Sequence, residues 1–160
     1  MIRKVSIRKL NELVSKNISH ISNYDKDEMA IPSYLHWNPL IRRLMWRRYE
    51  YIARFAEFSN DMSALEFGCG TSAFLPELDS RCNKVYVIDI FPEFAKILSD
   101  EQNLNISFID NILEIPNNSL DIIIAADVLE HIDNKELVEY LKIFSEKLKS
   151  SDRLIISGPT

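Results

Sequence analysis

Hydrophobic residues recur at helical spacing in the N-terminal part of the chain. In the first such stretch they occur every three or four positions, which predicts an amphipathic helix over residues 6–22. A turn-rich stretch over 22–39 follows, and the pattern then predicts a second helix over 40–58. The apolar residues of the first helix are Leu10, Leu13, Val14, Ile18 and Ile21.

The second helix has one apolar face and one basic face. At 100° per residue its apolar side chains fall within one arc, and we expect Arg43, Arg47 and Arg54 on the opposite, solvated side. Arg48 falls beside the apolar arc. We expect its stem to lie along apolar surface with its charge in water, the alternative being a charge that points into a cleft. The apolar arc consists of Ile41, Met45, Tyr49, Ile52 and Ala56.

From residue 63 onward the pattern changes to short β-branched runs that alternate with helical stretches. This alternation is typical of βαβ units, so it predicts an α/β fold with a mostly parallel sheet. Asp133, with Glu136 three residues later, predicts a capping box at the start of the last helix. The predicted strands are 64–67, 85–89, 106–109, 121–125 and 154–157, and the predicted helices are 72–78, 92–100 and 134–149. We therefore expect an N-terminal helical segment or lid over 1–60 and a core domain over 61–160.

Composition narrows the class of protein. The chain has 160 residues, 46% of them hydrophobic and 27% charged, which suffices for a core without disulfides. Cys69 and Cys82 fit no metal-binding spacing, so we expect no metal site. The longest strictly apolar run, 122–126, is far shorter than the roughly 18 residues of a spanning helix. We therefore expect a soluble, cytoplasmic protein without stable membrane insertion.

The charge is distributed unevenly along the chain. Residues 1–60 hold 11 Lys and Arg against 6 Asp and Glu, a net +5, whereas residues 61–160 hold 8 against 18, a net −10. A nucleic-acid-binding module would need a basic main body. The acidic main body therefore argues against a nucleic-acid partner.

Two of the three glycines, Gly68 and Gly70, lie where the first predicted strand gives way to the first helix of the sheet region. A glycine turn at that place lets a ligand approach the backbone closely. The alternative is a plain tight turn. The pair alone leaves the choice open.

Acidic residues fall at the ends of four predicted strands. Glu66, Asp89, Asp110 and Asp127 each lie at or just after a carboxyl end, the edge where open α/β sheets bind ligands. Asp89, 19 positions after Gly70, is placed to accept hydrogen bonds from a ribose. Each acid taken alone is equally compatible with helix capping or a solvated loop.

Two kinds of nucleotide ligand fit this turn. Gly68 and Gly70 with Ala73 also satisfy a relaxed dinucleotide fingerprint, which would indicate a nicotinamide-dependent oxidoreductase. Glu66 argues against that reading, because a carboxylate two residues before the first glycine would oppose a pyrophosphate. The same carboxylate would instead attract an aminoacyl ligand that carries an ammonium and a sulfonium.

Four ordered motifs together resemble the class I S-adenosylmethionine-dependent methyltransferases, especially the small-molecule type. Residues 66–70 read Glu-Phe-Gly-Cys-Gly, 87–90 read Val-Ile-Asp-Ile, and 110–112 read Asp-Asn-Ile. The fourth motif is Leu-Asp-Ile-Ile-Ile at 120–124 followed by Asp-Val-Leu-Glu-His at 127–131. The resemblance implies a Rossmann-like, doubly wound sheet of strand order 3-2-1-4-5 with N-terminal helices.

The resemblance also implies a cofactor, S-adenosyl-L-methionine, and roles for individual residues. The turn Gly68, Cys69 and Gly70 would lie against its methionine part, supported by Glu66. Asp89 would bind the ribose hydroxyls and Ile90 would pack on adenine. Asp110 would bind the adenine amine with Asn111 beside it, and Asp127 would complete the cofactor site. His131, Tyr34 and His36 are the candidate bases for an acceptor that must lose a proton.

The family's core normally has two further strands after the fifth. The sequence lacks them, so we expect either a fragment, or N-terminal helices or a second copy covering the exposed edge in a homodimer. The functional hypothesis is methyl transfer to a small-molecule acceptor. The alternatives are a non-catalytic cofactor- or partner-binding domain and, less favoured, an NAD(P)-dependent oxidoreductase.

Overall fold

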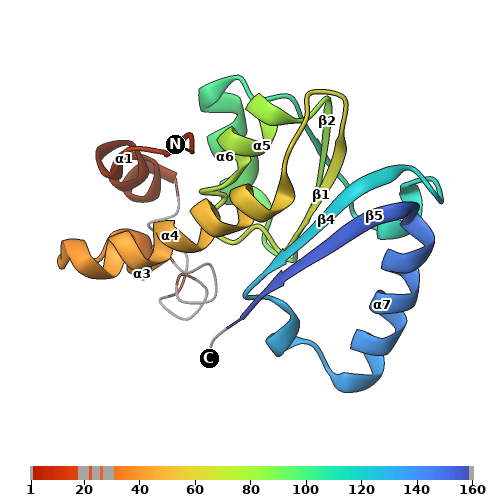
Figure 1. Cartoon of the computed structure of the whole chain (residues 1–160). Helices are drawn as coiled ribbons and strands as arrows, with labels where there is room; N and C mark the ends of the chain where they lie inside the picture. The colour runs from red at the N-terminus through yellow and green to blue at the C-terminus, as the bar shows by residue number, and fades with distance from the viewer. Residues whose placement is uncertain (1, 18–21, 23–25, 27–30, 159–160) are drawn as a thin grey trace.

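A five-stranded parallel sheet forms the centre of the computed structural model (Figure 1). Its strand order is β3-β2-β1-β4-β5, and every neighbouring pair runs parallel. The predicted fold and strand order are confirmed. The strands are β1 (Ser63–Phe67), β2 (Lys84–Ile88), β3 (Ile106–Phe108), β4 (Leu120–Ala126) and β5 (Leu148–Ser157).

Helices cover both faces of the sheet. The structure describes residues 2–17, 22, 26 and 31–158. In Figure 1, α7 lies on the opposite side of the sheet from α4, α5 and α6. The helices are α1 (Ile7–Asn17), α3 (Ile31–Tyr34), α4 (Pro39–Ala56), α5 (Leu75–Arg81), α6 (Glu93–Gln102) and α7 (Asn134–Lys147), with short 3-10 turns η1 (Ile112–Glu114) and η2 (Leu129–His131).

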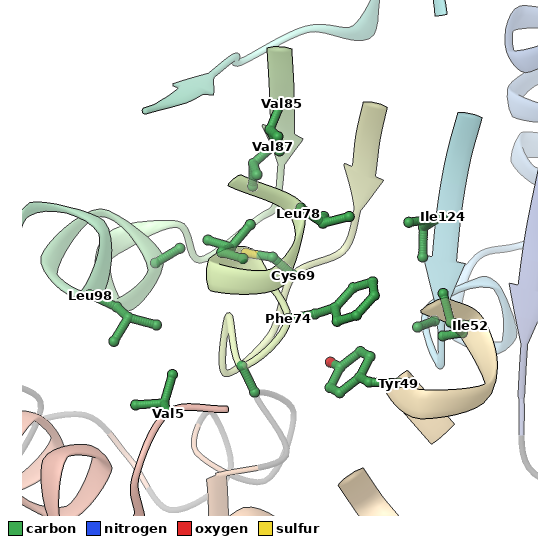
Figure 2. Packing of buried hydrophobic residues seen from close by; sticks show 14 of the residues in the cluster. Val5, Tyr49, Ile52, Cys69, Phe74, Leu78, Val85, Val87, Leu98 and Ile124 are labelled. Atoms are coloured by element: carbon green, nitrogen blue, oxygen red, sulfur yellow. The ribbon is translucent and has the colours of Figure 1, made fainter. Parts of the chain in front are cut away.

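Alternation along the strands creates two cores. Successive strand side chains point to opposite faces. Ala64 and Ile124 therefore pack with the helices of one face, and Leu65 packs with α7 on the other. Figure 2 shows the first core, in which Phe74 lies between α4 and the sheet. Its ring stacks on Tyr49 with centroids 4.7 Å apart and an interplanar angle of 5°.

The N-terminal helices share this first core with the sheet. Leu10 and Leu13 of α1 are buried in it, and Lys9 bonds Glu101 of α6 at 2.7 Å. Tyr49 and Ile52 bring α4 into the same cluster. Through this core α4 contacts the sheet, whereas α1 packs against α6.

Several predicted boundaries differ from the structure. The first helix ends at Asn17, and residues 18–21 of its predicted span lie outside the described residues. A short helix, α3, occupies 31–34 within the predicted turn-rich stretch. The helix predicted from residue 72 begins at Leu75, because Ser72 has a left-handed φ of 56° that cannot continue a helix.

The last helix and strand also differ from their predicted spans. Asp133 caps α7 by accepting the Lys135 amide at 2.9 Å, which confirms the N-cap. The second bond of the predicted capping box, from the Asp133 amide to Glu136, is not formed. The helix ends at Lys147 and β5 begins at Leu148, six residues before the predicted strand. The first half of β5 was not predicted because residues 149–152 are polar. The pairing of β5 with β4 contains an irregularity between Leu120 and Ile122.

At one edge of the sheet, β5 contacts the end of α4. Arg153 donates to the carbonyl of Phe55 at 3.0 Å and to the Glu57 carboxylate at 3.1 Å. This is a contact of the kind expected between the N-terminal helices and the edge strand. No helix within the described ranges is long and apolar enough to cross a membrane.

Candidate functional site

A cleft of about 520 Å³ lies at the carboxyl ends of the strands. It is the edge at which open α/β sheets bind ligands. Its walls come from the turns after β1, β2 and β4, from α3 and α4 on one side, and from η2 and α7 on the other. The residues that line it are Tyr34, Arg48, Tyr49, Phe67, Gly68, Cys69, Gly70, Thr71, Ile88, Asp89, Ile90, Phe91, Asp110, Ala126, Asp127, Val128, His131, Ile132, Glu136 and Tyr140.

The glycine turn forms the floor of the cleft. Gly68 has φ 77° and Gly70 has φ 46°, which are left-handed conformations that residues with a Cβ rarely adopt. A Cβ on Gly68 would come within 2.5 Å of Cγ2 of Val128. The turn after β1 is thus pressed against the turn after β4, which leaves bare backbone facing the cleft.

Asp89 holds the glycine turn against the end of β2. Its carboxylate accepts the Gly70 amide at 3.0 Å and the Phe91 amide at 2.8 Å. It also lines the cleft. Because a carboxylate has about four acceptor positions, Asp89 retains capacity for ligand hydroxyls.

Glu66 is a buried carboxyl group without a partner. Its side chain is 1% exposed, and neither oxygen makes a hydrogen bond. Burial, and then the charge of Asp89, raise the pKa of Glu66 well above its usual range, although Arg48 acts in the opposite direction. Close by in the chain, Oγ1 of Thr71 is likewise buried without a partner. Thr71 lines the cleft, whereas Glu66 is not among the lining residues. Buried polar groups without a protein partner indicate a polar ligand group or an ordered water close by.

Arg48 points into the cleft and forms an ion pair with Asp127. The expectation that its charge reaches solvent is wrong, since its side chain is only 17% exposed. One guanidinium nitrogen donates to the Tyr34 hydroxyl at 3.1 Å, and the guanidinium lies 5.1 Å from the Tyr49 ring centroid. Its Nε is buried without an acceptor. The alternative prediction, a charge in a cleft, is the correct one.

Asp127 is held by β5 as well as by Arg48. Its backbone amide donates to the Ser157 carbonyl at 2.9 Å, and the Ser157 hydroxyl donates to its carboxylate at 3.2 Å. Its φ of 51° is left-handed, a conformation that Asp and Asn tolerate better than most residues. Asp127 therefore stands at a fixed position beside the glycine turn.

The predicted adenine-side residues lie at the end of β3 and after β2. Asp110 and Ile90 line the cleft, and Ile90 is 84% exposed. Asn111 does not line it. Instead its side chain caps η1 by accepting the Leu113 amide at 2.9 Å, in a capping box with Glu114. The structure thus brings two of these three residues to the cleft.

The three candidate bases occupy different places. His131, in η2, lines the cleft. Tyr34 also lines it, but burial raises the pKa of its hydroxyl, which opposes deprotonation. His36 is not among the lining residues; its Nδ1 accepts the Asn38 amide at 3.0 Å at the start of α4. Two of the three candidates, His131 and Tyr34, therefore line the cleft, and His36 does not.

Several residues that line the cleft were not predicted as site residues from the sequence. Tyr49 was assigned only to the apolar arc of α4, and Glu136 only to a cap. Tyr140, whose ring centroid lies 4.9 Å from that of Phe67, carried no signal beyond its place on α7. Cys69 was predicted and does line the cleft, and burial raises the pKa of its thiol well above the usual range. Within the described residues, no group of three or more His, Cys, Asp or Glu is placed to hold a metal ion.

Comparison with known proteins gives the family. Residues 34–160 match the family model described as a methyltransferase domain. The chain belongs to this family, and its class is that of the class I S-adenosylmethionine-dependent methyltransferases. The match favours the methyltransferase reading of the glycine turn over the dinucleotide reading. No curated protein sequence matches the chain.

Solved structures share the fold. The chain is 28% identical to precorrin 8W decarboxylase from Methanobacterium thermoautotrophicum, with a TM-score of 0.58 over 69% of this chain and 61% of that one. It is 21% identical to the N-methyltransferase NodS from Bradyrhizobium japonicum in complex with S-adenosylhomocysteine, with a TM-score of 0.63 over 94% and 71%.

A third similar structure is a putative sarcosine dimethylglycine methyltransferase from Galdieria sulphuraria. It is 21% identical, with a TM-score of 0.65 over 83% of this chain and 58% of that one. The chain thus spans less than two thirds of the length of this protein and of the decarboxylase. Similarity at this level establishes the fold and leaves the acceptor open.

Proposed function

We propose that this chain binds S-adenosylmethionine in the cleft and transfers its methyl group to a small-molecule acceptor. The observation that carries the proposal is Glu66, a buried carboxyl group with no partner, at the end of β1 where the glycine turn begins. Glu66 does not itself line the cleft, so an ammonium bound beside the glycine turn would stabilise its ionised form by charge attraction or through an ordered water. The family match supports the cofactor class.

Other residues fit the remaining parts of the cofactor. Asp89 would accept hydrogen bonds from the ribose, and Asp110 from the adenine amine. Ile90, whose side chain is 84% exposed, would be covered by the adenine ring. Arg48 is the only lysine or arginine among the described residues that line the cleft, so it would bind the carboxylate.

For methyl transfer the chain mainly has to align the acceptor atom with the methyl group of the cofactor. The bound cofactor supplies an electrophilic methyl group on a sulfonium. A bond forms between acceptor and methyl carbon as the bond from that carbon to sulfur breaks, and holding the reactants in line lowers the barrier by up to about 7–11 kcal/mol. His131 would accept the proton that a hydroxyl or ammonium acceptor must lose.

Calorimetric titration with S-adenosylhomocysteine tests cofactor binding. We expect saturable binding, weakened at least tenfold by Asp89→Ala, and no comparable binding of a nicotinamide dinucleotide. Asp100→Ala is the matched control, because Asp100 is exposed on α6 and does not line the cleft. Tighter binding of the dinucleotide than of S-adenosylhomocysteine would refute the proposal.

A methyl-transfer assay tests turnover. The chain is incubated with S-adenosylmethionine labelled in the methyl group and with pools of small amines, hydroxyl compounds and activated carbon acids. We expect labelled product from at least one pool, and its loss in His131→Ala with cofactor binding retained. Binding without transfer to any pool would favour a non-catalytic cofactor-binding domain.

A further inference from the structure

The cleft holds one guanidinium for which two anions would compete. Arg48 is already paired with Asp127 in the structure. If the proposed function is correct, the carboxylate of the cofactor needs the same guanidinium, because Arg48 is the only lysine or arginine of the described lining, which otherwise holds four acidic residues. Two carboxylates beside one buried guanidinium carry an excess negative charge and repel each other, so the two anions compete for Arg48 even though its five donors could reach both.

Arg48 is built to accept a further anionic partner. Its buried Nε has no acceptor, so one of its five donors is unsatisfied. Leaving such a donor unpaired is costly, and a carboxylate approaching in bidentate fashion would satisfy it. Tyr34, which accepts from another guanidinium nitrogen at 3.1 Å, would keep the side chain in the cleft.

Asp127 can lose its cation without losing all its partners. Its carboxylate retains the hydrogen bond from the Ser157 hydroxyl, at 3.2 Å, and its side chain is 35% exposed. Water can therefore solvate the released charge. The turn keeps its place through the bond from the Asp127 amide to the Ser157 carbonyl, 2.9 Å.

We infer that Asp127 is an internal counter-ion of Arg48, which the carboxylate of the cofactor displaces on binding. This inference rests on the proposed function. It gives Asp127 a role different from the direct cofactor contact expected from the sequence. The displaced carboxylate of Asp127, which lines the cleft as His131 does, then favours an acceptor that presents a cation or a hydrogen-bond donor.

Two ligands separate this role from a direct contact. S-adenosylhomocysteine has the aminoacyl carboxylate, whereas 5′-methylthioadenosine has the same adenosine and thioether without it. A competitor for the carboxylate must affect only the first ligand. A residue that contacts the cofactor elsewhere would affect both.

Calorimetric titration of the full chain with both ligands is the test. Asp127→Asn removes the negative charge, and asparagine tolerates the left-handed backbone at this position. We expect this variant to bind S-adenosylhomocysteine about two- to fivefold more tightly, the upper part of the range for a partly exposed ion pair. Binding of 5′-methylthioadenosine should stay within about 1.5-fold. Asp100→Asn is the control for loss of one negative charge.

Arg48→Gln is the second variant. It should weaken S-adenosylhomocysteine about tenfold or more and leave 5′-methylthioadenosine unchanged, because only the first carries the carboxylate. In the Arg48→Gln background, Asp127→Asn should no longer tighten binding. If Asp127→Asn fails to fold, Asp127→Gly takes its place, because glycine adopts the left-handed backbone without strain and likewise removes the carboxylate.

Three outcomes would overturn the inference: weaker binding of S-adenosylhomocysteine by Asp127→Asn, unchanged binding, or equal shifts for both ligands in either variant. These outcomes leave the proposed function standing as long as the wild-type chain binds S-adenosylhomocysteine. Absence of binding of both ligands to the wild-type chain would refute the proposed function itself, and the exchange with it.

Discussion

Replacing Gly68 by alanine tests the packing that shapes the cleft floor. An alanine must adopt φ 77°, and its Cβ would lie 2.5 Å from Cγ2 and 2.7 Å from Cβ of Val128. The left-handed backbone costs about 1–2 kcal/mol. Overpacking against a neighbouring turn adds about 1–3 kcal/mol. We therefore expect a loss of about 2–5 kcal/mol from a total stability of about 5–15 kcal/mol.

Thermal and urea unfolding measure this loss. For a chain of this length each kcal/mol lowers Tm by about 2–4 °C, so we expect a decrease of about 4–20 °C. Gly158→Ala is the matched control, because the nearest atom to its Cβ would be Oε2 of Glu130 at 4.0 Å. That variant should change stability by less than about 0.5 kcal/mol.

A double variant tests how much of the loss comes from the contact with Val128. Val128→Ala removes the methyl groups at 2.5 and 3.2 Å from the new Cβ and leaves the Cβ of residue 128 at 2.7 Å, so Gly68→Ala should cost less in that background. We expect a coupling energy of about 0.5–3 kcal/mol. A Gly68→Ala variant as stable as Gly158→Ala would refute the close packing of the turns after β1 and β4.

Three further perturbations test the electrostatics and packing around the site. Because burial raises the pKa of Glu66, the folded chain binds its proton more tightly than the unfolded chain does. Its contribution to stability is therefore full below about pH 4.3 and is lost as pH rises toward the folded pKa. Glu66→Gln should remove this loss, so its advantage over wild type in urea unfolding should grow from pH 5 to 8; a parallel pH profile would contradict the pKa direction. Phe74→Ala should lower stability by about 3–5 kcal/mol, against less than about 1.5 kcal/mol for Phe74→Leu, because the ring is fully buried; equal losses in calorimetric melting would contradict its packing. Glu77→Ala should cost about 1–3 kcal/mol and speed proteolysis near the N-terminus, because the buried carboxylate accepts the Arg3 amide at 2.7 Å and the Arg81 guanidinium at 3.1 Å. Unchanged cleavage would show that this contact does not hold the N-terminal segment.

Periodic and local signals explain what the sequence could predict. The β-branched runs and the helical stretches between them predicted the parallel sheet, because burial on both faces leaves a strong pattern. Gly68 and Gly70 were informative because positive φ at a strand end demands residues of this kind. Asp89 and Asp110 followed from their positions after strands, and both line the cleft.

Features that depend on partners distant in the sequence could not be predicted. Helical spacing placed Arg48 beside the apolar arc of α4. It could not predict the ion pair with Asp127, which is distant in the sequence. His36 looked chemically suitable, yet its Nδ1 is used at the start of α4 by the Asn38 amide. Residues 149–152 of β5 are polar and lie in the register shift between the pairs Leu120–Leu148 and Ile122–Arg153, so this part of the strand has no hydrophobic pattern.

A crystal structure of the chain with S-adenosylhomocysteine tests the central claim most directly. The account predicts the ligand in the cleft against Gly68 and Gly70, with its ribose on Asp89 and its carboxylate on Arg48 in place of Asp127. A ligand bound outside this cleft, or an empty cleft at saturating ligand, would contradict it.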